Sequence, residues 1–250
     1  MEIALEVWNV SFRLDSRVLF RDLNLRLGKG QALFIVGGSG SGKSLLLRLC
    51  AGLIFPEEGK VTLGGTDLKT APRQEIQEAR ARIGFVFQDS ALISNMAVYD
   101  NIALPLRYHR KAAEEEVRAQ VGEKMKLFGV DRSFEWVLPA ALSLEMRKRA
   151  ALARAFILEP EFLFLDQPTG GLEREVAQRL TRIIHDYQKK RGASLLEVGS
   201  EYPPAGDYAD RVGLLEGGRI TAEGTREEMG DYLEKAKNVE NSNSQAPNPK

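Results

Sequence analysis

The chain has 250 residues, with 35 Lys and Arg against 35 Asp and Glu, so its formal net charge is zero. This balance argues against a broad basic surface for nucleic acid, and the single cysteine excludes a disulfide scaffold or a multi-thiolate zinc site. No run of residues approaches the ~20 apolar residues of a membrane span, and residues 1–10 lack the pattern of a signal peptide. We therefore expect a soluble or peripheral intracellular protein that binds no nucleic acid.

The first third of the chain is predicted to form strands. Apolar and polar residues alternate over residues 2–9 and 18–27, and residues 32–36 form a short apolar run typical of a buried strand. A glycine- and serine-rich segment follows, and a helix is expected at 43–51. Further strands are expected at 60–64 and 82–87.

Helical patterns dominate the middle of the chain, at 112–128 and 145–158, separated by a connection at 131–143 that contains Pro and Ser. An alternation of strands and helices then resumes. Its expected members are strand 161–165, helix 173–191, strand 194–198, a helix near 204–209, strand 211–216 and a last helix at 225–235.

This order predicts an α/β fold with a mainly parallel sheet. An antiparallel β-subdomain is expected at the N-terminus and a helical subdomain at about 88–158. Residues 236–250 are rich in Asn, Ser and Pro and nearly devoid of apolar side chains, which predicts a disordered tail.

A phosphate-binding loop is predicted where the third strand meets the first helix. The sequence GGSGSGKS matches the pattern G-x-x-x-x-G-K-[ST], and a flexible linker of the same composition would not occupy a strand-to-helix junction. Its backbone N–H groups and the helix N-terminus would surround phosphate oxygens. Lys43 would reach the β- and γ-phosphates, and Ser44 would bind Mg²⁺. The predicted nucleotide-binding residues are Gly37, Gly38, Ser39, Gly40, Ser41, Gly42, Lys43 and Ser44.

The second half of a nucleotide site is predicted in EFLFLDQP, residues 161–168. An apolar strand delivers Asp166 to its carboxyl end, where the carboxylate can hold the Mg²⁺ shell. In NTPases of this kind the next residue usually carries the carboxylate that polarises the attacking water. Here that residue is Gln167.

Taken in order, four segments resemble the ATP-binding cassette (ABC) ATPases across nearly the whole chain. They are GGSGSGKS, a strand that ends at Gln88, LSLEMRKRAALARAF and FLFLDQPTGGLE. More narrowly, QDSALISNMAVYDNIALPLRYHR and RKRAALARAFILEP resemble the ATPase subunit of Mce/Mla-type phospholipid transporters.

The resemblance implies a P-loop NTPase domain over residues 1–235, with ATP and Mg²⁺ as cofactors. It also implies a head-to-tail dimer, in which Ser143 of the signature segment faces the ATP of the other subunit. Gln88 resembles the residue that senses Mg²⁺ and water, beside Ser44 and Asp166, and residues 89–110 would face a membrane permease.

The partners implied are that permease, a second copy of the chain or another ABC ATPase, and an Mce-domain lipid-binding protein. The implied location is cytoplasmic and peripheral, on the inner face of the cell membrane.

The sequence departs from the family pattern at its catalytic positions. The signature, usually Leu-Ser-Gly-Gly-Gln or -Met, has Leu144 and Glu145 in place of the two glycines. The catalytic carboxylate is replaced by Gln167, and the switch histidine by Ser200. The D-loop aspartate is replaced by Glu173. A weaker fifth departure is Leu14 at the adenine-stacking aromatic, where Phe12 is the nearest ring.

These departures predict that nucleotide binding survives and that hydrolysis is impaired. An amide cannot accept a proton near neutral pH, which removes roughly 10²–10⁴ in rate if the carboxylate at 167 acts as a base. Ser143 can still cap its helix. Glu145 would repel a phosphate by about 4 kcal/mol per charge pair at ~4 Å and an effective dielectric near 20. Ser200 is too short to reach the γ-phosphate as an imidazole does.

The basic run 147–149 is expected to be a solvated helix face near the partner's phosphates, rather than a nucleic-acid site. A lone Gln167 could be an engineered trapping substitution, but the several departures together favour a naturally degenerate ATPase.

We therefore predict the ATP-binding subunit of an ABC transporter, of the lipid-transport kind, with weak or absent hydrolysis. Two alternatives stay open. One is a nucleotide-gated structural or regulatory subunit of a membrane complex, and the other is a soluble ABC protein that does not act in transport.

Overall fold

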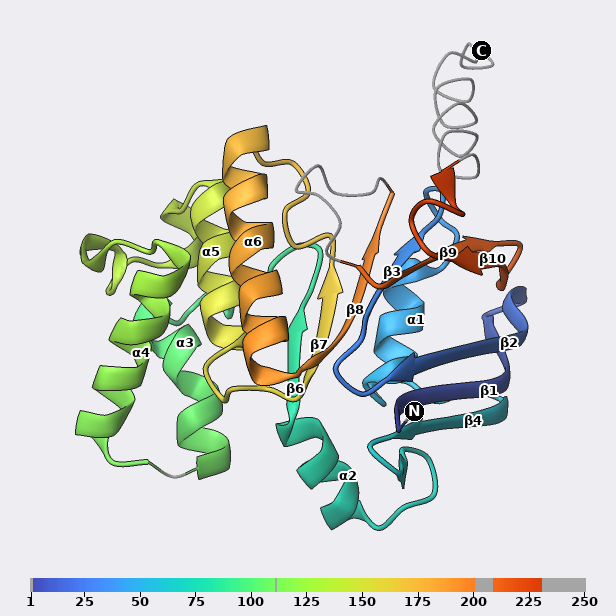
Figure 1. The fold of residues 1–250 in the computed structure, drawn as a ribbon. Helices are drawn as coiled ribbons and strands as arrows, with labels where there is room; N and C mark the ends of the chain where they lie inside the picture. The colour runs from blue at the N-terminus through green and yellow to red at the C-terminus, as the bar shows by residue number, and fades with distance from the viewer. Residues whose placement is uncertain (1, 111, 201–208, 231–250) are drawn as a thin grey trace.

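The computed structural model describes residues 2–110, 112–200 and 209–230, which form two β-sheets and a group of helices (Figure 1). The N-terminal sheet is antiparallel and has the strand order β2-β1-β4-β5. Its strands are β1 (Ile3–Leu14), β2 (Arg17–Gly28), β4 (Glu58–Leu63) and β5 (Thr66–Asp67). This sheet is the expected antiparallel β-subdomain.

The second sheet has the strand order β10-β9-β3-β8-β7-β6 and is parallel except for β10, which pairs antiparallel with β9. Its strands are β3 (Ala32–Val36), β6 (Ile83–Val86), β7 (Phe162–Asp166), β8 (Ser194–Gly199), β9 (Arg211–Glu216) and β10 (Arg219–Gly224). The carboxyl ends of parallel strands share one edge, and this edge is where such folds bind ligands.

Two hydrophobic clusters cover the two faces of the parallel sheet. On one face, Leu33 and Ile35 of β3 pack in a cluster with Leu46 and Leu47 of helix α1 (Lys43–Cys50). On the other, Phe34 belongs to the cluster of helices α5 (Leu144–Ala155) and α6 (Arg174–Arg191). Every residue of β3 and β7 is therefore buried, which explains their continuous apolar sequences.

The helical part lies beside the parallel sheet (Figure 1). Helix α3 (Val98–Pro105) continues into a π-helical turn (Leu106–Arg110), and α4 (Glu114–Phe128) follows. Two short 3₁₀ turns, Arg132–Phe134 and Pro139–Ala141, connect α4 to α5. Helix α2 (Arg73–Ala81) connects β5 of the antiparallel sheet to β6 of the parallel sheet.

Most of the predicted elements are present within one or two residues of their expected bounds. The predictions missed α2, α3, β5 and β10, which are short. Of the predicted last helix, residues 226–229 form a turn, Gly230 is helical, and 231–235 lie outside the described residues. Outside them also lie the predicted tail, 236–250, and all but Ala209 of the helix near 204–209.

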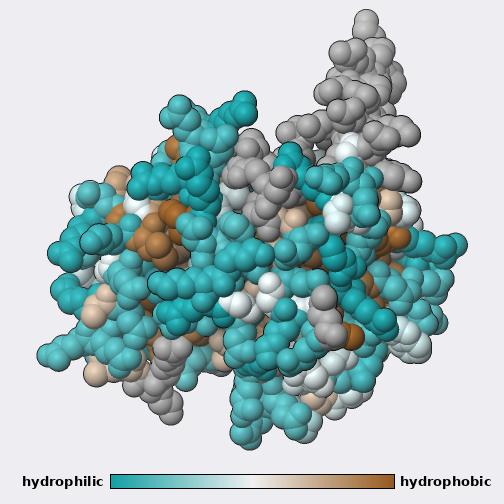
Figure 2. Space-filling model, in the orientation of Figure 1, coloured by the Kyte–Doolittle hydropathy of each residue, from teal (hydrophilic) through white to brown (hydrophobic). Residues whose placement is uncertain are grey.

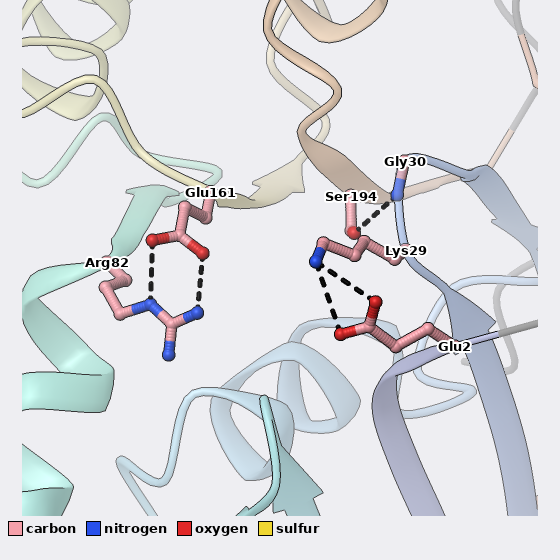
Figure 3. Close-up of polar contacts among 6 residues, drawn as sticks. All are labelled: Glu2, Lys29, Gly30, Arg82, Glu161 and Ser194. Carbon is pink, nitrogen blue, oxygen red and sulfur yellow. Dashed lines mark hydrogen bonds and ion pairs between the residues drawn. The ribbon is translucent and has the colours of Figure 1, made fainter.

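The amino ends of the parallel strands border a cavity of about 370 Å³, whose charged side chains bind one another (Figure 3). Lys29 Nζ lies 3.1 Å from Glu2 Oε2, and Arg82 Nε donates to Glu161 Oε1 at 2.9 Å. Because these cations are paired within the chain, this edge offers little free charge to a phosphate ligand.

In the parts of the chain that the structure describes, no helix has the length and apolarity needed to cross a membrane. The face shown in Figure 2 is largely hydrophilic, with small apolar patches.

Candidate nucleotide site

The predicted phosphate loop joins the carboxyl end of β3 to the start of α1, as the motif requires. Gly40 and Gly42 have φ angles of 75° and 98°, a left-handed conformation that favours glycine. At Gly37 a Cβ atom would lie 2.6 Å from the carbonyl oxygen of Leu215. The loop therefore needs glycine for its backbone path, independently of any ligand.

Lys43 lies over this loop with only 6% of its surface exposed. Its Nζ donates to the carbonyl oxygens of Gly37 and Gly38, the latter at 2.7 Å. Helix α1 begins at Lys43 without a side-chain cap, so its first turn directs N–H groups toward the loop. The loop thus combines a held ammonium with backbone donors, which suits an anionic ligand.

A cavity of about 400 Å³ lies at the same edge of the sheet and brings together the three residues predicted to face Mg²⁺. Ser44 comes from α1, Gln88 from the segment after β6, and Asp166 from the end of β7. The lining residues are Ser44, Arg48, Phe87, Gln88, Asp89 and Asp166. Ser143 is not among them.

Asp166 is 3% exposed, and its Oδ1 atom is buried without a hydrogen-bond partner. Burial raises the pKa of Asp166, against the opposing effects of a hydrogen bond with Ser44 and the positive charges of Lys43, Arg48 and Lys148. A buried carboxylate oxygen without a donor fits a hard cation, because Mg²⁺ is commonly held by one or two carboxylates together with substrate phosphates. The described residues contain no cluster of three or more His, Cys, Asp or Glu that could hold a metal alone.

Gln167 follows Asp166 in a left-handed conformation, with φ at 46°. Its N–H donates to the carbonyl of Val198 on β8 at 3.0 Å, and its carbonyl accepts from Gly170 N–H at 3.1 Å and from Lys148 Nζ at 2.7 Å. Left-handed backbone costs a non-glycine residue on the order of 1 kcal/mol, so these bonds hold the turn in place.

The signature segment begins α5 with the cap that the sequence predicts. Ser143 Oγ accepts from the N–H of Met146 at 3.2 Å. Leu144, where the family has glycine, is 40% exposed, and its Cδ2 atom lies 3.1 Å from the Cβ position built on Gly171. The signature therefore presents an apolar side chain and packs against the D-loop of its own chain.

The predicted repulsion between Glu145 and a phosphate is too large, because the carboxylate of Glu145 forms an ion pair with Arg149. Its Oε1 accepts from Nε of Arg149 at 2.8 Å, one helical turn later, and Arg149 also donates to the carbonyl of Phe128 at 2.6 Å. The side chain of Arg149 is 8% exposed and that of Glu145 41%. A neutralised pair repels a phosphate far less than the lone charge that we assumed.

The prediction of a solvated face at 147–149 is also wrong. Lys148 and Arg149 are buried, at 2% and 7% exposure, while Arg147 is half-buried. Lys148 donates to the carbonyl of Gln167, and Arg149 donates to the carbonyl of Phe128. The long apolar stems of Lys and Arg allow their charged groups to reach these carbonyls.

The other positions that differ from the family pattern do not line the cavity. Ser200 immediately follows β8 and is half-buried, and Glu173 is an exposed residue before α6. At the end of β1, Leu14 is 54% exposed, and Phe12 is half-buried. Sequence reasoning missed the cavity residues Arg48 and Asp89 altogether.

Comparisons with known proteins agree with this geometry. The sequence pattern of the ABC transporter family matches residues 20–170. This chain belongs to the ABC transporter family. The expected resemblance and the P-loop ATPase fold are therefore confirmed.

Two ABC transporter relatives illustrate the range of similarity. The probable ribonucleotide transport ATP-binding protein mkl of Mycobacterium leprae is 36% identical over 91% of this chain, which spans only 65% of that protein's length. The intermembrane phospholipid transport ATP-binding protein MlaF of Haemophilus influenzae is 32% identical over 90% of this chain and 85% of its own. The predicted resemblance of this chain to Mla-type ATPases is thus confirmed by a relative of that kind.

Among solved ABC transporter structures, the dimeric structure of an ATP-binding cassette bound to ADP and Pi is similar, with a TM-score of 0.82 and 26% identity. The match covers 88% of this chain and 98% of that one. The similarity therefore extends over both sheets and the helical part.

Proposed function

We propose that this chain is the nucleotide-binding subunit of a lipid-transporting ABC transporter, and that it binds MgATP with slow or absent hydrolysis. The observation that carries the proposal is the cavity at the carboxyl edge of the sheet. There Ser44 and Asp166 lie together beside an intact phosphate loop, while the following position holds the amide of Gln167.

Binding follows from the residues that are retained. The N–H groups of residues 37–44 surround the phosphates, and Lys43 exchanges its bonds with loop carbonyls for phosphate oxygens. Ser44, Asp166 and the amide oxygen of Gln88 are oxygen donors suited to Mg²⁺, which when bound neutralises phosphate charge.

Hydrolysis is limited by what the residues cannot do. The amide of Gln167 orients a water molecule but cannot accept its proton, which costs about 10²–10⁴ in rate. The Leu144 side chain occupies space where the family has bare backbone, so the partner's γ-phosphate cannot approach those N–H groups closely. The side chain of Ser200 is too short to contact the γ-phosphate as a histidine side chain would.

The partners proposed are a membrane permease, with residues 89–110 facing it, and a second ABC ATPase, either another copy or a different chain. An Mce-domain lipid-binding protein is a further candidate. The MlaF relatives support the lipid-transport assignment, and the proposed location is the cytoplasmic face of the membrane.

A restoration series tests this function. The substitutions Gln167→Glu, Leu144→Gly with Glu145→Gly, and Ser200→His are made singly and together, and steady-state phosphate release is measured beside MgATP affinity. We expect wild type to bind MgATP and to turn over far more slowly than about one per second, while the combined variant gains at least about 10²-fold.

The control is Lys43→Ala in the combined variant, which should remove the gained activity if it arises at this phosphate loop. Wild-type hydrolysis as fast as that of the combined variant would contradict the impaired site. Absence of MgATP binding would refute the function as a whole. Binding without turnover, even with a permease bound, would favour the structural alternative.

A further inference from the structure

Lys148 is a buried lysine at the junction of the two segments that face the proposed metal site. It lies on α5 and is 2% exposed. Its Nζ donates to the carbonyl of Gln167 at 2.7 Å and to the carbonyl of Gln88 at 3.4 Å. One side chain therefore joins the turn after β7 to the segment after β6.

The charge of Lys148 is buried at a cost in free energy. Burial lowers the pKa of Lys148, and the carboxylates of Asp166 and Asp89 only partly oppose this effect. The bonds that its ammonium makes are to neutral carbonyls. An apolar side chain could fill the same space, so what a lysine adds here is the pair of hydrogen bonds to the carbonyls of Gln88 and Gln167.

The segments that Lys148 joins are strained. Gln167 has a φ of 46°, and Ser90 and Ala91 have φ angles of 70° and 42°. Such conformations persist when surrounding contacts determine them. A second residue of α5, Arg154, also holds the segment after β6. It donates to the carbonyls of Ser90 at 2.9 Å and Ala91 at 2.8 Å.

We propose that Lys148 is a positioning residue that fixes the backbones of Gln88 and Gln167 relative to each other, and so sets the geometry that receives Mg²⁺ with ATP. The same helix begins at the signature cap Ser143. A displacement of the signature by a partner subunit would therefore move both metal-facing segments through Lys148. This inference rests on the proposed binding of MgATP.

The test compares Lys148→Met with Lys148→Arg, and uses Lys124→Met as a matched control. Lys124 is another buried lysine, 5% exposed, but it lies on α4 and pairs with Glu123 and Glu159. The affinity for ATP is measured once in the presence of Mg²⁺ and once in EDTA. The ratio of the two affinities is the gain in affinity due to Mg²⁺.

We expect Lys148→Met to lower that gain by about fivefold, the effect of one lost anchoring bond, with little change in the affinity measured in EDTA. Lys148→Arg should restore most of it, and Lys124→Met should leave it unchanged. Loss of a positive charge beside Asp166 would by itself raise the affinity for Mg²⁺, so a fall reports on position and not on charge.

Amide hydrogen exchange in the nucleotide-free protein gives an independent readout. Lys148→Met should accelerate exchange in residues 88–91 and 167–170 relative to wild type, with recovery in Lys148→Arg. This arm does not depend on nucleotide, so it still tests Lys148 if wild type proves not to bind MgATP, a result that would refute the proposed function alone.

Three outcomes would overturn the inference. They are an unchanged or increased Mg²⁺ gain in folded Lys148→Met, an equal loss of affinity with and without Mg²⁺, and unchanged exchange in both segments. Should Lys148→Met not fold, Lys148→Gln takes its place, because its shorter amide can reach only one of the two carbonyls.

Discussion

At the level of single residues, Glu145 and Gln167 alter charge in opposite directions with different consequences. Gln167 stands where the family has a carboxylate, at a position whose backbone is held by three hydrogen bonds. We therefore expect the turn to keep its conformation and only proton transfer to be lost. Glu145 adds a carboxylate that binds Arg149 of the same helix. We expect the first change to act on proton transfer and the second to act on the stability of the signature segment.

The pairing of Glu145 leads to a stability prediction. Glu145→Ala removes the carboxylate from the buried guanidinium of Arg149, which keeps its hydrogen bond to the Phe128 carbonyl, and should lower the free energy of unfolding by about 1 kcal/mol. Chemical denaturation measures this change. Glu175→Ala, in the first turn of α6, is the control and should cost less. Equal effects of the two substitutions would show that the ion pair is worth nothing beyond the helix dipole.

The environment of these residues could be predicted only in part. The spacing of Glu145 and Arg149 is the i, i+4 spacing of helical ion pairs and was available in the sequence. The burial of Lys148 was not, because it depends on how α5 lies against two segments that are distant in the chain.

At the level of elements, the carboxyl end of α4 is joined to α5 through Arg149. Gly129 ends α4 with a φ of 68°, and a Cβ there would lie 2.5 Å from Nη1 of Arg149. Gly192 ends α6 in the same conformation, with a φ of 65°, but a Cβ there would meet nothing within 4 Å. The two helix ends differ only in what surrounds them.

This difference predicts unequal effects of the same substitution. Gly192→Ala should lower the free energy of unfolding by about 1 kcal/mol, the cost of the left-handed backbone. Gly129→Ala should cost about 2–3 kcal/mol, because the new methyl group also displaces the guanidinium from the Phe128 carbonyl. Chemical denaturation of the two variants measures the two free energies of unfolding. Equal decreases would mean that the side chain of Arg149 moves aside at no cost.

The elements that the sequence predicts well are long or continuously apolar. β3, β7 and α6 have clear periodicity or composition, because buried faces constrain most of their residues. α2 was missed because Ala79 is its only buried residue among those described. β10 was missed because it is an edge strand with alternating half-buried and exposed residues that follow a glycine turn.

At the level of the whole molecule, the two hydrophobic clusters hold two helices on opposite faces of one sheet, α1 after the phosphate loop and α5 after the signature cap. α1 packs in one cluster and α5 in the other. Ser143 does not line the cavity of Ser44 and Asp166, and in the proposed assembly it would face the nucleotide of another subunit. This arrangement fits the proposed head-to-tail assembly.

Dimerisation is therefore expected to depend on the signature. With MgATP, wild type should self-associate only weakly, because Leu144 and Glu145 occupy the surface that would receive the partner's nucleotide. The variant Leu144→Gly with Glu145→Gly should form a stable dimer, since the retained Gln167 prevents hydrolysis from releasing it. Sedimentation or light scattering measures the molar mass.

Adding Lys43→Met to that variant should return it to a monomer if nucleotide drives the association. Wild-type dimerisation to the same extent, at the same protein and MgATP concentrations, would contradict the obstructed signature and favour a homodimer that tolerates these side chains.

The amino-acid sequence by itself determined the fold family, the phosphate loop and the missing carboxylate at Gln167, because these depend on local patterns and on residue chemistry at one position. Only the tertiary structure decided which charges are paired or buried. Whether Glu145 repels a phosphate and whether Lys148 is solvated depend on atoms brought close by packing α5 against α4, β6 and β7. Electrostatic energies change severalfold with such burial and pairing, and neither can be read from residues taken in order.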